Sequence, residues 1–195
     1  MNVIQIGCNL CDDEIFSFIK KNSSEISELI IVDALPNCIE IAKEKYNFFK
    51  GKIEFVNCAI GIESKMVDFF YPKNEETSGH ASVYEDHVKR HLHKEVEKFS
   101  IECYEINEFL EKRSLKDIHL FAIDIEGLDV DVLLKLDFDK VNINNIIYEF
   151  THADNTFSVG LKHNLLIQKL NNLGYTCQQI SEYNILATKN AGQKN

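Results

Sequence analysis

The chain has 195 residues, of which 45% are hydrophobic, and its 31 acidic against 21 basic side chains give a formal charge of −10. This length predicts one globular domain with a core large enough to need no disulfide or metal for stability. The acidic excess argues against a nucleic-acid backbone or an anionic membrane surface as the main partner, because clustered lysine and arginine make those contacts. A small molecule or a protein is the expected partner.

The cysteines and the N-terminus favour a cytoplasmic protein. Six cysteines would allow three disulfide bridges, but such a framework is typical of much smaller secreted chains, so free cytosolic thiols are expected. No basic lead precedes the first apolar run, which argues against a signal peptide, and no apolar run approaches the ~20 residues that span a bilayer. We expect a single domain over residues 1–195, with a flexible polar tail at 189–195.

The first third of the chain alternates short apolar runs with helical patterns. Strands are predicted at residues 3–6, 29–32 and 53–56, where the apolar runs are too short and too β-branched for helices. Helices are predicted between them, the first after the acids at 12–13 and the second from Pro36. This alternation predicts a parallel sheet with helices on both faces.

The middle of the chain is less regular. Alternation at 66–71 predicts another strand, and a polar span at 72–98 follows, with a helical pattern over about 84–94. Because this span has few large apolar residues, it is a candidate lid over the strand ends. Its histidines at 87, 91 and 93 could bind a metal, but the interleaved basic residues favour a solvated helix face.

Regular alternation returns in the last part of the chain. Strands are predicted at 120–123 and 146–148, followed by a helix over 161–173 that ends at Gly174. Two final strands, at 175–180 and 183–188, are so close that only an antiparallel hairpin can join them. A parallel sheet finished by such a hairpin differs from the plain dinucleotide-binding arrangement.

Polar residues follow the predicted parallel strands, and ligands of open α/β sheets bind beyond those carboxyl ends. Gly7 allows a ligand to approach the backbone closely, and Asp33 can accept both hydroxyls of a ribose. A lone aspartate there is as often a helix cap, but the two features one strand apart are far more informative than either alone. The complete set at the strand ends is Gly7, Asn9, Asp33, residues 57–59, Asp124, Glu126 and Glu149.

Four motifs resemble the FkbM family of S-adenosylmethionine-dependent methyltransferases. They are Gln5-Ile6-Gly7-Cys8-Asn9, the acid with Pro36 after the second strand, Asn57-Cys58-Ala59-Ile60-Gly61, and Ile123-Asp124-Ile125-Glu126-Gly127 with Asp129. The Asp-x-Glu-Gly block is the most specific of them, and the resemblance runs from Val3 to Thr188. It implies the class I methyltransferase fold, a Rossmann-like α/β fold with a seven-stranded, mostly parallel sheet, helices on both faces and a C-terminal antiparallel hairpin.

The resemblance also implies where S-adenosylmethionine binds. Its methionine part is expected on Gly7, Cys8 and Asn9, and its ribose on Asp33. The adenine is expected beside Asn57, Cys58 and Ala59, and Asp124 is expected to contact the cofactor as well. Gln5, Cys11 and Ala122 depart from the family pattern, which usually has an acid, a glycine and a lysine at these places.

Methyl transfer to a hydroxyl needs aligned reactants and a group that takes the hydroxyl proton. Asp124 and Glu126 lie two residues apart at a strand end and are the leading candidates, with Glu149 as a third catalytic carboxylate. Glu126 could instead bond the backbone amides of the next helix. The predicted substrate contacts are His80, Ser82 and His152.

We expect an O-methyltransferase that acts on a hydroxyl of a sugar, a glycan or another small molecule, the glycan being implied only by the resemblance. A catalytically silent binding module of the same fold is the alternative, favoured by Gln5, Cys11 and Ala122. An NAD-dependent oxidoreductase is disfavoured by the missing glycines and the terminal hairpin.

No metal is predicted, although Asp124 and Glu149 would suit Mg²⁺. A redox or zinc role for Cys8 and Cys11 is disfavoured, because no second pair has the spacing of metal ligands. Association into a homo-oligomer and the identity of the acceptor stay open.

Overall fold

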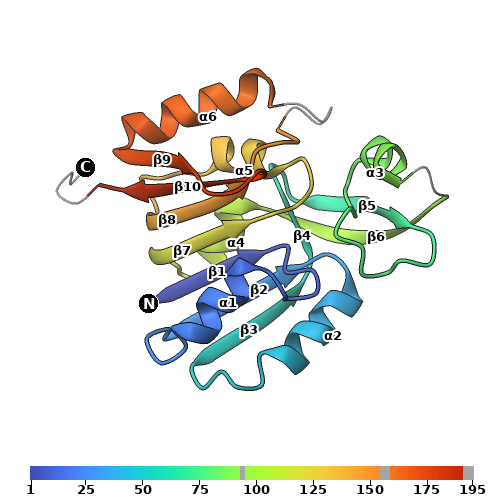
Figure 1. Cartoon of the computed structure of the whole chain (residues 1–195), viewed down its shortest axis with the longest axis horizontal. Helices are drawn as coiled ribbons and strands as arrows, with labels where there is room; N and C mark the ends of the chain where they lie inside the picture. The colour runs from blue at the N-terminus through green and yellow to red at the C-terminus, as the bar shows by residue number, and fades with distance from the viewer. Residues whose placement is uncertain (93–94, 154–158, 191–195) are drawn as a thin grey trace.

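The computed structural model describes residues 1–92, 95–153 and 159–190, and its main element is a seven-stranded sheet of order β3-β2-β1-β7-β8-β10-β9 (Figure 1). The first five strands in that order are parallel, and β10 is antiparallel to both β8 and β9. The strands are β1 (Asn2–Ile6), β2 (Glu28–Asp33), β3 (Lys52–Asn57), β7 (Asp117–Ile123), β8 (Asn142–Glu149), β9 (Tyr175–Gln179) and β10 (Asn184–Lys189). The predicted fold class is therefore confirmed, including the antiparallel hairpin.

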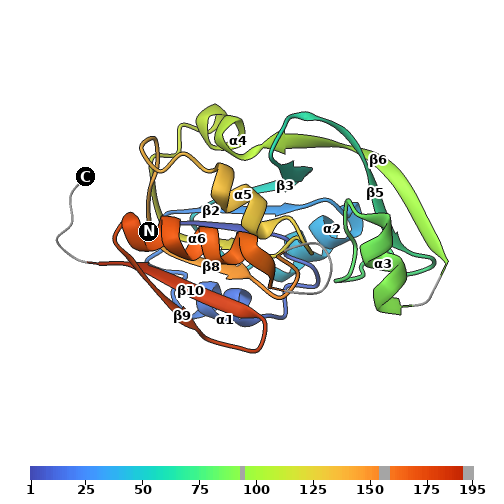
Figure 2. The same cartoon turned by 90° about the horizontal axis from the view of Figure 1, so that it is seen from above.

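Helices cover both faces of this sheet, and Figure 2 shows α1 and α4 on opposite sides of it. Alternate strand residues enter two apolar cores, as Ile4 and Val3 of β1 do. The helices are α1 (Glu14–Lys21) and α2 (Pro36–Lys45) on one face, and α4 (Ile106–Lys112), α5 (Asp129–Lys135) and α6 (Gly160–Asn172) on the other. None of the helices in the described part of the chain has the length and apolar character needed to cross a membrane.

A second, three-stranded sheet stands beside the first, in the order β4-β6-β5 (Figure 1). It contains β4 (Ala59–Gly61), β5 (Lys65–Pro72) and β6 (Val96–Glu105), and α3 (Glu85–Leu92) packs against it. The predicted strand at 66–71 is confirmed as β5. Neither β6 nor α4 was predicted, because charged residues interrupt β6, although Phe99, Ile101 and Cys103 alternate there.

Two segments are more ordered than the sequence indicated. In the span 72–98 the helix predicted over about 84–94 is confirmed as α3, and the ends of the span belong to strands, since Pro72 ends β5 and Val96 begins β6. The polar tail expected at 189–195 begins later, because Lys189 ends β10 and the Asn190 amide donates to the Gly174 carbonyl. Residues 191–195 lie outside the described part of the chain.

The strand order reverses between β1 and β7, and Gly7 and Asp124 meet at that point. The Asp124 amide donates to the Ile6 carbonyl over 2.9 Å, and Gly7 adopts a φ of 79°. A Cβ at residue 7 would lie 1.7 Å from the Asp124 backbone oxygen. Only glycine fits this position, for both its conformation and its space.

We expect Gly7→Ala to lower the free energy of unfolding by about 4 kcal/mol or to prevent folding, because a left-handed backbone and a backbone clash act together. Gly174→Ala is the matched control, since Gly174 has a φ of 82° at the end of α6. It should cost about 1–2 kcal/mol. Urea unfolding followed by circular dichroism measures both, and equal losses would contradict the role given to the Gly7–Asp124 contact.

Candidate active site

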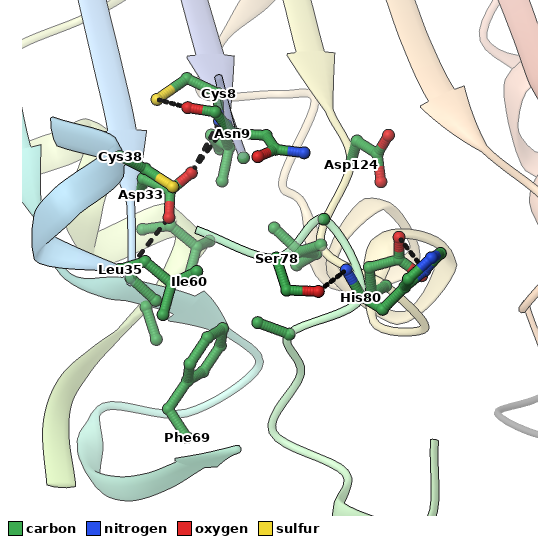
Figure 3. Close-up of a pocket in the computed structure, with 18 of the residues that line it drawn as sticks. Cys8, Asn9, Asp33, Leu35, Cys38, Ile60, Phe69, Ser78, His80 and Asp124 are labelled. Carbon is green, nitrogen blue, oxygen red and sulfur yellow. Dashed lines mark hydrogen bonds and ion pairs between the residues drawn. The ribbon is translucent and has the colours of Figure 1, made fainter. Parts of the chain in front are cut away.

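A cavity of about 450 Å³ opens at the carboxyl ends of β1, β2 and β7 (Figure 3). Ligands of open α/β sheets bind at this kind of place, where the strand order reverses. The turn after β1, the start of α2, the 58–60 segment and the loop at 78–83 form its walls. Of the predicted site residues, Gly7, Cys8, Asn9, Asp33, Cys58, Ala59, His80, Asp124 and Glu126 line it.

Asp33 shapes the turn that follows β1. Its Oδ2 accepts hydrogen bonds from the backbone amides of Cys8 and Asn9, both 3.0 Å, and its Oδ1 accepts one from the Leu35 amide at 2.8 Å. The side chain is buried, and burial raises its pKa while these amides oppose the rise. The carboxylate therefore orders the predicted methionine turn, and its contact with a ribose stays a prediction.

Asn9 and Asn57 have different surroundings. Asn9 lines the cavity, and its buried Oδ1 has no hydrogen-bond partner among the described residues. Asn57 does not line the cavity; its Nδ2 donates to the backbone oxygens of Asp33 and Ala34, which joins the end of β3 to the loop after β2. The predicted contact of Asn57 with adenine therefore has no counterpart in the cavity wall.

The three departures from the family pattern are buried, and none of them lines the cavity. Gln5 points to the α1 and α2 side of the sheet, where its Nε2 donates to Asp13 Oδ2 at 2.8 Å and its Oε1 accepts from the Tyr46 hydroxyl at 3.1 Å. Cys11 has a φ of 49°, a backbone conformation in which glycine would be unstrained. Ala122 belongs to the core on the same face as Gln5.

The thiols of Cys8 and Cys11 are both free and buried. A hydrogen bond with Cys11 and burial raise the pKa of Cys8 far above its usual range. A thiol in such surroundings stays protonated, whereas redox chemistry and zinc binding need the thiolate. This favours the expectation that the pair is structural.

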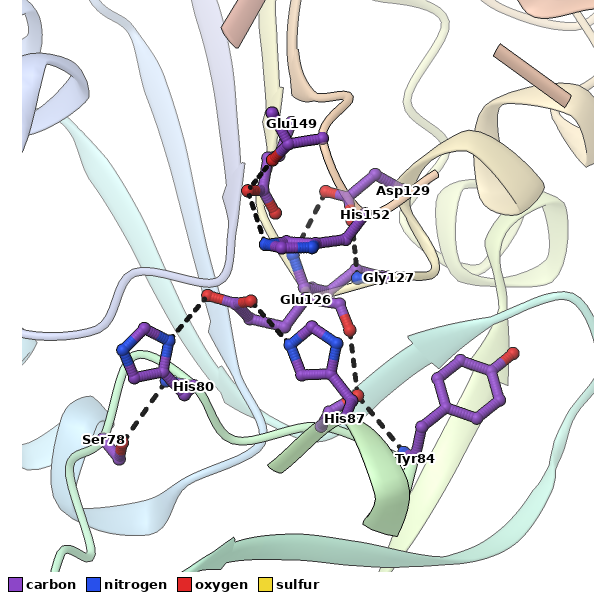
Figure 4. Close-up of polar contacts among 12 residues, drawn as sticks. Ser78, His80, Tyr84, His87, Glu126, Gly127, Asp129, Glu149 and His152 are labelled. Atoms are coloured by element: carbon purple, nitrogen blue, oxygen red, sulfur yellow. Dashed lines mark hydrogen bonds and ion pairs between the residues drawn. The ribbon is translucent and has the colours of Figure 1, made fainter. Parts of the chain in front are cut away.

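Glu126 is held between two histidines from the 78–92 segment (Figure 4). Its Oε2 lies 2.9 Å from His87 Nε2, and its Oε1 lies 3.8 Å from His80 Nδ1. The Ser82 hydroxyl donates to the Glu126 backbone oxygen at 2.9 Å, and Glu126 has a φ of 55°. The candidate lid is thus bonded to the acid block, and Ser82 is fully buried and does not line the cavity.

The burial of His87 differs from the solvated position predicted for it. A solvated face was predicted for this helix, but His87 is only 1% exposed, so the prediction is wrong for this residue. The helical period alone could not reveal this, because the partner, Glu126, is 39 residues away in the chain. His93 lies outside the described residues.

Asp129, and not Glu126, accepts hydrogen bonds from the backbone amides of the turn after β7. Its Oδ1 accepts from the Ile125 amide at 3.1 Å and its Oδ2 from the Gly127 amide at 3.4 Å. With the amides of this turn bonded to Asp129, the Glu126 carboxylate faces the histidines instead. The sequence did not predict a role for Asp129, although its place in the motif was a signal.

Glu149 and His152 lie beside Glu126, outside the cavity wall. Glu149 Oε1 accepts from the Thr151 hydroxyl at 2.7 Å and lies 3.5 Å from His152 Nε2. The His152 ring meets the His87 ring edge-on, with centroids 5.0 Å apart. The predicted catalytic and substrate residues at the ends of β7 and β8 are therefore neighbours in space.

Several carboxyl groups lie close to one another at this end of the sheet. Burial and the nearby Asp124 and Glu149 raise the pKa of Glu126 to about 10. Desolvation and the charge of Glu149 raise the pKa of Asp124. Burial and Asp124 raise the pKa of Asp129 as well. Among the described residues, no lysine or arginine lines the cavity. Mutual repulsion therefore disfavours ionisation of these carboxyls together, and a cationic ligand beside them would relieve that repulsion.

Comparison with known proteins places the chain in a family. A family model for the methyltransferase FkbM domain matches residues 5–177. The crystal structure of methyltransferase FkbM from Methylobacillus flagellatus KT has a TM-score of 0.55 and 12% identity to this chain, covering 96% of this chain and 43% of that one. The structure of TrmK from M. capricolum in complex with S-adenosyl-homocysteine has a TM-score of 0.44 and 12% identity, covering 97% and 62%.

This chain therefore spans less than half the length of the M. flagellatus structure, and the similarity to it concerns the fold. None of the curated proteins matches the chain. The family model nevertheless covers most of the chain, including the turn after β1, Asp33 and the Asp124–Asp129 block. The chain belongs to the FkbM methyltransferase family.

Proposed function

We propose that this protein transfers a methyl group from S-adenosylmethionine to a hydroxyl of a sugar, a glycan or another small molecule. The observation that carries the proposal is the charge of the cavity. Its carboxyl-bearing lining residues are Asp12, Asp13, Asp33, Asp124 and Glu126, and no lysine or arginine among the described residues lines it. Such a lining attracts a sulfonium and an ammonium group, whereas it repels the pyrophosphate of a dinucleotide.

The residues present fit this cofactor. The unpartnered Oδ1 of Asn9 is an acceptor for the ammonium group of the methionine part. Asp33 accepts three backbone bonds and can still accept a ribose hydroxyl, since an ionised carboxylate has about four acceptor sites. Leu35, Ile60 and Phe69 provide an apolar wall that suits an adenine ring (Figure 3).

The cofactor supplies the reactive methyl group, and the protein supplies alignment and a proton acceptor. Asp124 is open to the cavity at the end of β7, where it can take the hydroxyl proton of the acceptor. Glu126, oriented by His87, is placed to hold that hydroxyl, and Glu149 adds negative charge beside it. A positioned base of this kind typically contributes ~10²- to 10⁴-fold in rate.

The acceptor would bind between the acid block and the loop at 78–83. Ser78 and His80 from this loop line the cavity, and the His80 side chain is 44% exposed. Polar side chains of this kind suit a molecule with several hydroxyls. The cytoplasmic location is part of the same proposal, supported by six free cysteines.

The composition of the cavity wall argues against the alternative of a catalytically silent binding module. Gln5, Cys11 and Ala122 favoured that alternative, but none of them lines the cavity, and Gln5 ties β1 to α1 and α2. The acidic lining also disfavours an NAD-dependent oxidoreductase. We therefore retain methyl transfer as the proposed activity.

We expect calorimetric titration of the intact protein to detect binding of S-adenosylmethionine and S-adenosylhomocysteine, and no binding of NAD, because the lining is acidic. S-adenosylhomocysteine lacks the sulfonium charge, so it should bind more weakly than S-adenosylmethionine when salt is low. Failure of both sulfur ligands to bind would remove the proposed function.

We expect Asp124→Asn to keep the affinity for S-adenosylhomocysteine within about threefold and to lower methyl transfer roughly 100-fold, because the shape stays while the base is lost. Transfer from radiolabelled S-adenosylmethionine to a panel of sugars and small alcohols measures the rate. Asp139→Asn, which changes an exposed carboxylate away from the cavity, is the control. Unchanged turnover in Asp124→Asn would exclude Asp124 from the mechanism.

We expect Asp33→Ala to lose about 3 kcal/mol of stability and most of the affinity for S-adenosylhomocysteine, since three amides lose their acceptor at roughly 1 kcal/mol each. Asp33→Asn, which keeps one acceptor oxygen, should lie between this variant and the wild type. Asp12→Ala should change the stability by less than about 0.5 kcal/mol. Urea unfolding and calorimetry measure the two effects, and a stable Asp33→Ala protein would contradict the role of the carboxylate in the turn.

A further inference from the structure

Glu126, Glu149 and His152 bring three metal-ligating side chains to one point (Figure 4). One carboxylate oxygen from each glutamate and one imidazole nitrogen all lie within 4.8 Å of one another. The residues come from the loop after β7, the end of β8 and the turn that follows β8. The predicted Mg²⁺ alternative involved Asp124 and Glu149, so this set of ligands was not expected.

The spacing suits a single ion. Two ligand atoms that each lie about 2.1 Å from the same ion are roughly 3–4.2 Å apart. One ligand atom from each of the three residues lies within 4.8 Å of the others, so a small contraction would bring all three to one ion; His152 Nε2 is 3.5 Å from Glu149 Oε1, and Glu149 Oε2 belongs to the same carboxylate. The three side chains are largely buried, with exposed fractions of 15%, 9% and 14% for Glu126, Glu149 and His152.

Glu149 provides an independent indication that a ligand belongs here. Its Oε2 is buried and has no hydrogen-bond partner among the described residues, while its Oε1 accepts from Thr151. A buried carboxylate oxygen without a donor is costly unless a cation or a donor occupies the space in front of it. None of the lysines or arginines in the described ion pairs contacts Glu126 or Glu149.

Neighbouring groups orient the carboxylates as they do around known metal sites. His87 Nε2 contacts Glu126 Oε2, and the Thr151 hydroxyl contacts Glu149 Oε1. Bonds of this kind to one oxygen of a carboxylate fix the direction of the other oxygen. The pair of glutamates would also match the charge of a divalent ion.

We propose that Glu126, Glu149 and His152 bind one divalent first-row transition metal ion of the Zn²⁺ class. An imidazole ligand favours such ions over Mg²⁺, which prefers oxygen alone. Three protein ligands leave a coordination position open, as in catalytic zinc sites. Because Glu126 also lines the cavity, an ion held by these three residues would lie next to the cavity.

The test is a calorimetric titration of chelator-treated, full-length protein with zinc chloride, and it needs no cofactor or acceptor. We expect one equivalent to bind, and Glu149→Gln and His152→Asn to weaken binding at least about tenfold, since each removes one ligand. His119→Gln is the control, because His119 lies in β7 away from its carboxyl end. Magnesium chloride at the same concentration should bind more weakly than zinc.

Two results would overturn the proposal. The first is that the wild-type protein binds no zinc. The second is that Glu149→Gln and His152→Asn bind zinc as tightly as the wild type and the His119→Gln control. Thermal unfolding with and without zinc covers a variant that is hard to purify, since a bound ion raises the melting temperature of wild type alone. The outcome is separate from methyl transfer. If the protein binds S-adenosylhomocysteine but not zinc, only the proposed metal site is overturned. If it binds zinc but neither S-adenosylhomocysteine nor S-adenosylmethionine, only the proposed function is overturned.

Discussion

The contact between Gly7 and Asp124 is the constraint on which the site depends. Both residues follow parallel strands that are neighbours at the point where the strand order reverses, and the glycine allows their backbones to approach without a Cβ between them. This approach places the turn ordered by Asp33 directly beside the acid block of β7. A larger residue at position 7 would separate the two halves of the cavity.

The concentration of negative charge follows from that arrangement. The formal charge of −10 is a property of the whole chain, but Asp124, Glu126, Asp129 and Glu149 collect near one end of the sheet. Burial and mutual repulsion raise the pKa values of the first three, so a cation that binds there would be stabilised. The proposed sulfonium cofactor and the proposed metal ion would both relieve this repulsion, the cofactor in the cavity and the ion between Glu126, Glu149 and His152.

The loop and helix after β5 connect this charge to the rest of the molecule. Ser82 bonds the Glu126 backbone, and His87 bonds its carboxylate, so the 78–92 segment is tied to the acid block instead of lying over it loosely. Movement of the segment would therefore change the orientation of Glu126. The second sheet has a part in this, because β5 pairs with Ser82 through Phe70.

The sequence by itself determined the alternation of strands and helices, the antiparallel hairpin, the end of α6 at Gly174 and the list of polar residues at the strand ends. Those features are local: period, β-branching and turn residues act within a few positions of one another. The roles of Asp129 and His87, the placement of Gln5 away from the cavity and the meeting of Glu149 and His152 with Glu126 were decided only by the tertiary structure. These contacts join residues on different elements, and which carboxylate faces a histidine and which caps a turn depends on packing that no local pattern records.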